Sequence, residues 1–131
     1  MQKVVIDTNV VVSAVISPTG NPAKIITQLF SGALLLHYCA EILGEYALVL
    51  SRSKLKIPPK IQSDILDAIR ESGIMIVPSK SDISMTDESD RIFYDTAKAT
   101  SSFLITGNMK HYPSEDFIVT PAAFLTATIQ N

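Results

Sequence analysis

Short apolar runs alternate along this chain with longer stretches in which apolar positions recur every three or four residues. Uninterrupted runs rich in Val, Ile and Leu are typical of buried strands, and the wider spacing is typical of helices with one buried side. The short runs predict five strands, at residues 2–6, 34–39, 74–77, 103–106 and 117–119. The spaced stretches predict helices over residues 9–16, 22–30, 40–51 and 89–100. A further helix is carried by Ile61, Ile65, Leu66 and Ile69 and is closed by Gly73, and a last helix starts at Pro121 with Phe124, Leu125 and Ile129 on its apolar side.

Turn-forming residues separate these elements. Residues 17–22 read Ser-Pro-Thr-Gly-Asn-Pro, a strong loop signal, and the pair Pro58-Pro59 interrupts the chain again. Strands that alternate with helices predict a parallel sheet covered by helices on both faces. Because no internal repeat or linker divides the chain, we predict one domain over residues 1–131. Its expected fold is a three-layer α/β/α sandwich with a mostly parallel five-stranded sheet.

Composition excludes several classes of protein. Of the 131 residues, 47% are hydrophobic and 18% are charged, which favours a packed core over disorder. No apolar stretch is long and pure enough to span a bilayer, and no basic leader precedes an apolar segment, so we expect a cytoplasmic protein without a membrane partner. The single cysteine, Cys39, cannot form an internal disulfide. Together with the only two histidines, His37 and His111, it does not form a zinc-binding motif.

The net charge of −2 argues against a broad basic surface for nucleic acid. Charge is nevertheless clustered. Four basic residues fall close together, namely Arg52, Lys54, Lys56 and Lys60, and five acids fall within another short segment, namely Asp82, Asp87, Glu88, Asp90 and Asp95. These clusters are consistent either with two solvated faces or with a basic segment beside an acidic pocket.

Four polar residues are expected at one edge of the sheet. Asp7 ends the first predicted strand and Asn108 follows the fourth, while Glu45 and Asp90 lie in helices that follow the second and third strands. Simpler interpretations exist for the acids: Asp7 or Asn9 can cap a helix, and an acid such as Asp90 is favoured near a helix N-terminus. A lone glutamate such as Glu45 more often sits at the edge of the buried face, with its carboxylate reaching water. Their shared placement at the carboxyl ends of parallel strands favours a common pocket. Clustered carboxylates repel one another, and Mg²⁺ or Mn²⁺ relieves that repulsion with oxygen ligands.

The chain resembles the PIN domain, a metal-dependent ribonuclease fold, and within it the bacterial and archaeal branch of toxin–antitoxin toxins. The resemblance covers nearly the whole chain and rests on five motifs in order: Val5-Ile6-Asp7-Thr8-Asn9-Val10, Glu41-Ile42-Leu43-Gly44-Glu45-Tyr46, Asp87-Glu88-Ser89-Asp90-Arg91-Ile92-Phe93-Tyr94, Leu104-Ile105-Thr106-Gly107-Asn108 and Ile118-Val119-Thr120-Pro121-Ala122-Ala123-Phe124-Leu125. Each motif alone is weak, but five at fitting spacing are a strong signal.

The resemblance implies an acidic triad for Mg²⁺ or Mn²⁺ and a set of residues that contact RNA. The implied catalytic and metal-binding residues are Asp7, Glu45 and Asp90, with Asn108 as a weaker ligand where many relatives carry an aspartate. The implied substrate-binding residues are Thr8, Asn9, Arg52, Lys54 and Lys56. Asp95 lies five positions after Asp90, off its helical face, and its contribution stays open.

The implied activity is hydrolysis of RNA phosphodiesters by the toxin of a toxin–antitoxin pair. Its implied partners are RNA, an antitoxin protein and a second copy of the chain in a homodimer. An alternative is a catalytically weak or inactive PIN-like module that binds RNA or regulates. A receiver-type signalling domain also holds a metal on a parallel sheet, but its phosphoacceptor aspartate is missing after the third strand, where Ile76-Val77-Pro78-Ser79 stands.

Overall fold

The computed structural model describes residues 1–130, with the side chains described as far as residue 127. The strands are β1 (Gln2–Ile6), β2 (Leu34–Tyr38), β3 (Ile74–Met75), β4 (Phe103–Ile105) and β5 (Ile118–Val119). The α-helices are α1 (Thr8–Ile16), α2 (Asn21–Phe30), α3 (Ala40–Leu50), α4 (Pro59–Ser72), α5 (Arg91–Thr100) and α6 (Pro121–Gln130). Short 3₁₀ turns are η1 (Ser53–Leu55), η2 (Glu88–Asp90) and η3 (Met109–His111). The apolar position predicted at Ile129 lies outside the described side chains.

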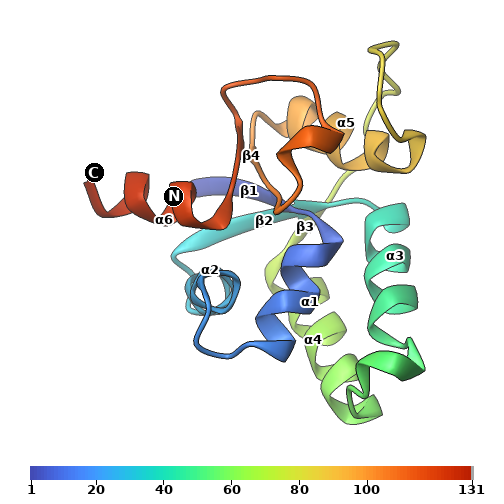
Figure 1. Ribbon diagram of the computed structural model, residues 1–131, viewed down its shortest axis with the longest axis vertical. Coiled ribbons are helices and arrows are strands. Elements are labelled where there is room, and N and C mark those ends of the chain that lie inside the picture. The colour runs from blue at the N-terminus through green and yellow to red at the C-terminus, as the bar shows by residue number, and fades with distance from the viewer. Residues whose placement is uncertain (131) are drawn as a thin grey trace.

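The five strands form one sheet in the order β3-β2-β1-β4-β5, and every neighbouring pair is parallel. Helices α1, α3 and α4 lie on one side of the sheet and α5 on the other (Figure 1). The predicted three-layer α/β/α fold is therefore confirmed, with a sheet that is wholly rather than mostly parallel. No helix in the described part of the chain is long and apolar enough to cross a membrane.

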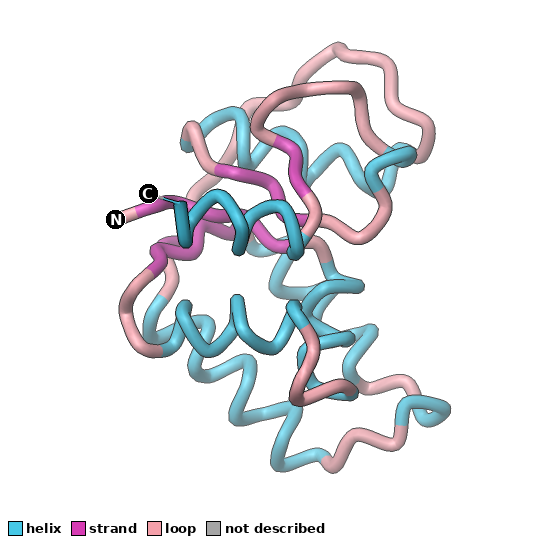
Figure 2. The backbone as a smooth tube through the Cα atoms, turned by 60° about the vertical axis from the view of Figure 1, so that its left-hand side comes forward, coloured by secondary structure: helices cyan, strands magenta, loops and turns pink. Residues whose placement is uncertain are grey.

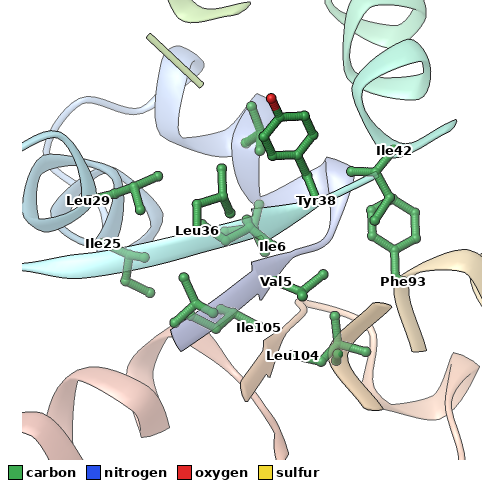
Figure 3. Close-up of a cluster of buried hydrophobic side chains, with 14 of the residues drawn as sticks. Val5, Ile6, Ile25, Leu29, Leu36, Tyr38, Ile42, Phe93, Leu104 and Ile105 are labelled. Carbon is green, nitrogen blue, oxygen red and sulfur yellow. The ribbon is translucent and has the colours of Figure 1, made fainter. Parts of the chain in front are cut away.

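Buried aliphatic side chains join the layers. Figure 3 shows Ile25 and Leu29 of α2 beside Leu36 of β2, all at most 2% exposed. Phe93 of α5 is fully buried, and α5 packs against β1, β2 and β4. This burial explains why the strands read as continuous apolar runs, because both of their faces are covered.

The third predicted strand is the main difference from the sequence analysis. It was expected over residues 74–77 but is only Ile74–Met75, both of which are exposed at the sheet edge. The chain then runs without regular structure as far as η2 and forms the uppermost loop in Figure 2, which is yellow in Figure 1. Side chains of α5 replace strand pairing for this loop: Arg91 donates to the carbonyl oxygens of Ser81 and Ile83, and Asp95 accepts from the Ser81 amide.

The strand order locates the ligand crevice of the sheet. Strands β2 and β3 lie on one side of β1, and the next strand in the chain, β4, lies on the other side of β1. In open parallel sheets such a switch leaves a crevice outside the carboxyl ends of the two strands. The β1–β4 pairing opposes Ile6 to Ile105, so the residues that follow both strands meet at one point.

Candidate active site

A polar cleft of about 460 Å³ opens at the carboxyl ends of β1 and β4. It brings together eight of the residues singled out from the sequence: Asp7, Thr8, Asn9, Glu45, Arg52, Lys54, Asp90 and Asn108. Asp87 and His111 line it as well. Asp7 and Asn108, which are 101 positions apart in the chain, therefore share one cavity at the edge of the sheet where the sequence predicts that they meet.

Asp7 is held rigidly at the bottom of this cleft. It occupies the N-cap position of α1, yet its side chain makes no capping hydrogen bond, so the simple capping interpretation is wrong. Its Oδ2 instead accepts hydrogen bonds from the Thr106 hydroxyl at 2.7 Å and the Tyr112 hydroxyl at 3.1 Å. The residue is 7% exposed. Two fixed donors on one oxygen orient the carboxylate and leave Oδ1 for the cleft.

Glu45 reaches the cleft from α3. The Thr8 hydroxyl donates a hydrogen bond to its Oε2. The next residue, Tyr46, donates from its buried hydroxyl to the Ile6 carbonyl oxygen, which ties α3 to the end of β1. Burial first, and the charge of Asp7 second, raise the pKa of Tyr46, so its hydroxyl stays a neutral donor. Through its hydrogen bond to Oε2, Thr8 positions the carboxylate of Glu45.

Asp90 is the least satisfied acid of the cleft. It stands at the start of α5, its side chain is 15% exposed, and its Oδ2 is buried without a hydrogen-bond partner among the described residues. Burial is the main cause that raises its pKa to about 6, and the charges of Asp7, Asp87 and Glu45 raise it further, against an opposing effect of His111. The folded protein thus holds this carboxylate at a cost in free energy.

The two asparagines differ in their surroundings. Asn9 is half-buried, and its Oδ1 is a buried acceptor without a partner in the described part of the chain. Asn108 is exposed at the mouth, where its backbone amide donates to the Thr106 hydroxyl at 3.0 Å. Both therefore present neutral oxygen donors to the cavity.

The structure does not bring two further candidates into the cleft. Lys56 ends η1 with a positive φ of 55° and does not line the cavity, unlike Arg52 and Lys54. Asp95 is 4% exposed and lines a separate cavity together with Arg91. Five helical residues span well over one turn, so Asp90 and Asp95 leave α5 in different directions.

The donor set suits a hydrated hard cation. Within the described residues, no group of three or more His, Cys, Asp or Glu side chains is close enough to enclose a metal ion. Mg²⁺ does not require such a cage, because it keeps several waters and binds through one or two carboxylates. The unpaired buried oxygens of Asp90 and Asn9 are the type of ligand that this ion takes.

Sequence profiles now place the chain among known proteins. The profile of the PIN domain matches residues 3–110. The chain belongs to the PIN domain family. It is also similar to the uncharacterized protein MJ1680 of Methanocaldococcus jannaschii, with 32% identity over 109 residues that cover 81% of this chain and 70% of the relative.

Membership assigns the chain a nuclease-type, hydrolytic function. PIN domains are generally nucleases that act on RNA and use divalent metal ions. The cleft at the β1–β4 switch point holds the acids that the resemblance singles out. Sequence reasoning gave no role to Thr106, although it lies within the fourth motif, or to Tyr112 and His111, which lie outside the five motifs and reach the site only through the fold.

Proposed function

We propose that this protein is a Mg²⁺- or Mn²⁺-dependent endoribonuclease whose metal site is built from Asp7, Glu45 and Asp90. Asp90 carries the proposal. Its carboxyl group is buried beside Asp7 and Asp87, its Oδ2 has no hydrogen-bond partner among the described residues, and its pKa is raised to about 6. A buried carboxylate that neighbouring acids destabilise would be stabilised by a bound cation.

The side chains of the cleft have separable tasks. A bound divalent cation lowers the pKa of a water and offsets charge on the phosphate under attack. Asp7, fixed by Thr106 and Tyr112, supplies a rigid oxygen ligand. Glu45 or Asp90 orients the attacking water by accepting its hydrogen bond. Asn9 and Asn108 add neutral oxygens that hold the hydration shell or the substrate.

Arg52 and Lys54 are proposed to hold the RNA backbone. They line the cleft from the segment that follows α3, beside the carboxylates, so a phosphate held by them lies next to the metal site. Lys56 follows η1, two residues after Lys54, and does not line the cavity. Aromatic residues are only 7% of the chain and there is no tryptophan, which favours phosphate contacts over base stacking.

The resemblance to the toxin branch supports a cellular role. We infer a cytoplasmic toxin that cleaves RNA until an antitoxin protein binds it. Induced expression in a bacterial host should slow growth, and Asp7→Asn should abolish that effect. A protein that slows growth equally with Asp7→Asn would act by something other than its nuclease site.

Cleavage of a fluorescent single-stranded RNA tests the proposed activity directly. The parent protein should cleave it with Mg²⁺ or Mn²⁺ and not in chelator. Asp7→Asn and Asp90→Asn should abolish cleavage, because each removes an anionic oxygen ligand. Glu71→Gln removes an exposed acid at the end of α4, far from the cleft, and is the matched control. Cleavage that persists in chelator or in Asp7→Asn would refute the proposal.

A catalytically weak RNA-binding module is the second candidate. The neutral side chain of Asn108 at the mouth and the net charge of −2 favour it. Under that alternative the parent cleaves no RNA with either metal, while parent and Asp7→Ala bind RNA equally well.

A further inference from the structure

His111 stands at the mouth of the cleft, directly opposite Asp90. Its imidazole Nδ1 lies 3.4 Å from Asp90 Oδ2, and its side chain is 48% exposed. The contact is not a hydrogen bond, because Oδ2 has no hydrogen-bond partner among the described residues. A ring nitrogen and a carboxylate oxygen, both of which can bind a metal, therefore face each other at short distance, and the oxygen has no hydrogen bond among the described residues.

The separation of these two atoms matches that of neighbouring ligands on one ion. In an octahedral site with bonds of about 2.1 Å, adjacent ligand atoms lie about 3 Å apart. A small side-chain adjustment closes 3.4 Å to that separation. A neutral imidazole with its proton on Nε2 presents a lone pair at Nδ1, which is a common metal ligand.

The backbone fixes His111 in this place. The turn η3 is closed by hydrogen bonds from the His111 amide to the Asn108 carbonyl at 3.0 Å and from the Tyr112 amide to the Met109 carbonyl at 3.2 Å. Tyr112 is buried and donates to Asp7. Tyr112 thus supports Asp7, while the preceding residue, His111, faces Asp90.

We propose that His111 Nδ1 is a ligand of the same cation as Asp90, which makes the site a mixed nitrogen and oxygen site selective for Mn²⁺ over Mg²⁺. The inference rests on the proposed function, because it takes Asp90 as a metal ligand. Mg²⁺ is hard, prefers oxygen and keeps its waters, whereas first-row transition ions accept imidazole nitrogen. One nitrogen ligand therefore strengthens binding of Mn²⁺ and contributes little to binding of Mg²⁺.

Metal binding to the purified protein, without RNA, tests this assignment. By calorimetry, the Kd for Mn²⁺ should rise about tenfold or more in His111→Leu, because even residues that only support a metal ligand change metal affinity by that factor. The Kd for Mg²⁺ should change about twofold or less. His111→Asp replaces nitrogen by oxygen and should tighten Mg²⁺ binding. Lys110→Gln changes the exposed neighbour on η3 and should leave both constants unchanged.

Pulsed electron paramagnetic resonance of bound Mn²⁺ supplies a second readout. The parent should show coupling to an imidazole nitrogen, and His111→Leu should lose it while circular dichroism shows an unchanged fold. Coupling that is absent in the parent, or that survives in His111→Leu, would overturn the assignment. So would equal Mn²⁺ affinity in both proteins, the result expected if His111 only forms an ion pair with Asp90.

Asp90→Asn separates this inference from the proposed function. If Asp90→Asn loses Mn²⁺ binding while His111→Leu binds like the parent, the metal site stands and the role of His111 is wrong. If the parent binds neither ion at millimolar concentration, both are wrong.

Discussion

Replacing Asp90 by asparagine should stabilise the metal-free protein. The change keeps the size of the side chain and removes a charge that the folded state holds at a cost, since burial and neighbouring acids raise the pKa of Asp90 from 3.8 to about 6. One pKa unit corresponds to about 1.4 kcal/mol, so the full shift corresponds to at most about 3 kcal/mol. Water at the open cleft screens the charge, and we expect a gain of about 1–2 kcal/mol in the free energy of unfolding.

The pH dependence of this gain follows from proton binding. Between pH 3.8 and about 6 the folded protein binds more protons at Asp90 than the unfolded chain does. The free energy of unfolding of the parent therefore falls as the pH rises through this window. Asparagine does not titrate, so the advantage of Asp90→Asn should be full above pH 6 and should vanish towards pH 4.

Thermal unfolding in chelator, followed by circular dichroism from pH 4 to 8, measures the effect. A gain of 1–2 kcal/mol corresponds to a rise in Tm of about 4–8 °C for a domain of this size. Glu71→Gln, on an exposed face of α4, should not change the Tm. With saturating Mn²⁺ the parent should have the higher Tm, because the ion stabilises the parent and binds the variant poorly. A variant that is less stable than the parent at pH 7.5 in chelator would refute the reasoning, as would a gain that does not vary with pH.

Three other variants test the rest of the site. Asn108→Asp adds an anionic oxygen at the mouth and should tighten Mn²⁺ binding measured by calorimetry, and an unchanged Kd would place Asn108 outside the metal shell. Arg52→Ala combined with Lys54→Ala should weaken RNA binding and lower the slope of log K against log salt by about 1 to 2, with metal affinity intact; an unchanged slope would mean that neither contacts phosphate. Tyr112→Phe removes one donor to Asp7 and should cost about 1 kcal/mol of stability, seen as a lower Tm, and up to about tenfold in Mn²⁺ affinity; a variant like the parent in both would show that Thr106 alone orients Asp7.

Asp7 is less informative than Asp90 for the stability test. Its carboxylate accepts two hydrogen bonds, from Thr106 and Tyr112, so an asparagine there alters hydrogen bonding as well as charge. A single Tm would then combine the stability lost with the hydrogen bonds and the stability gained by removing the charge. Asp90 Oδ2 has no hydrogen-bond partner among the described residues, which makes the charge the main variable.

The sequence by itself determined the order of elements and the edge of the sheet where the acids meet. Buried parallel strands need apolar residues on both faces, so β1, β2 and β4 are visible as continuous runs. Chain direction then places whatever follows each strand at the same edge, which is why the shared cleft of Asp7 and Asn108 could be predicted without coordinates. The third strand was overestimated because an edge strand at Ile74–Met75 is apolar in sequence yet exposed in the fold.

Only the tertiary structure decided how the acids are supported. Thr106 and Tyr112 meet Asp7 from 99 and 105 positions away, a pairing that depends on the register of β1 against β4. His111 faces Asp90 because a 3₁₀ turn carries it there. Apolar periodicity reports which side of an element is buried. It carries no information on which polar groups meet across the sheet, because those contacts depend on distances set by packing.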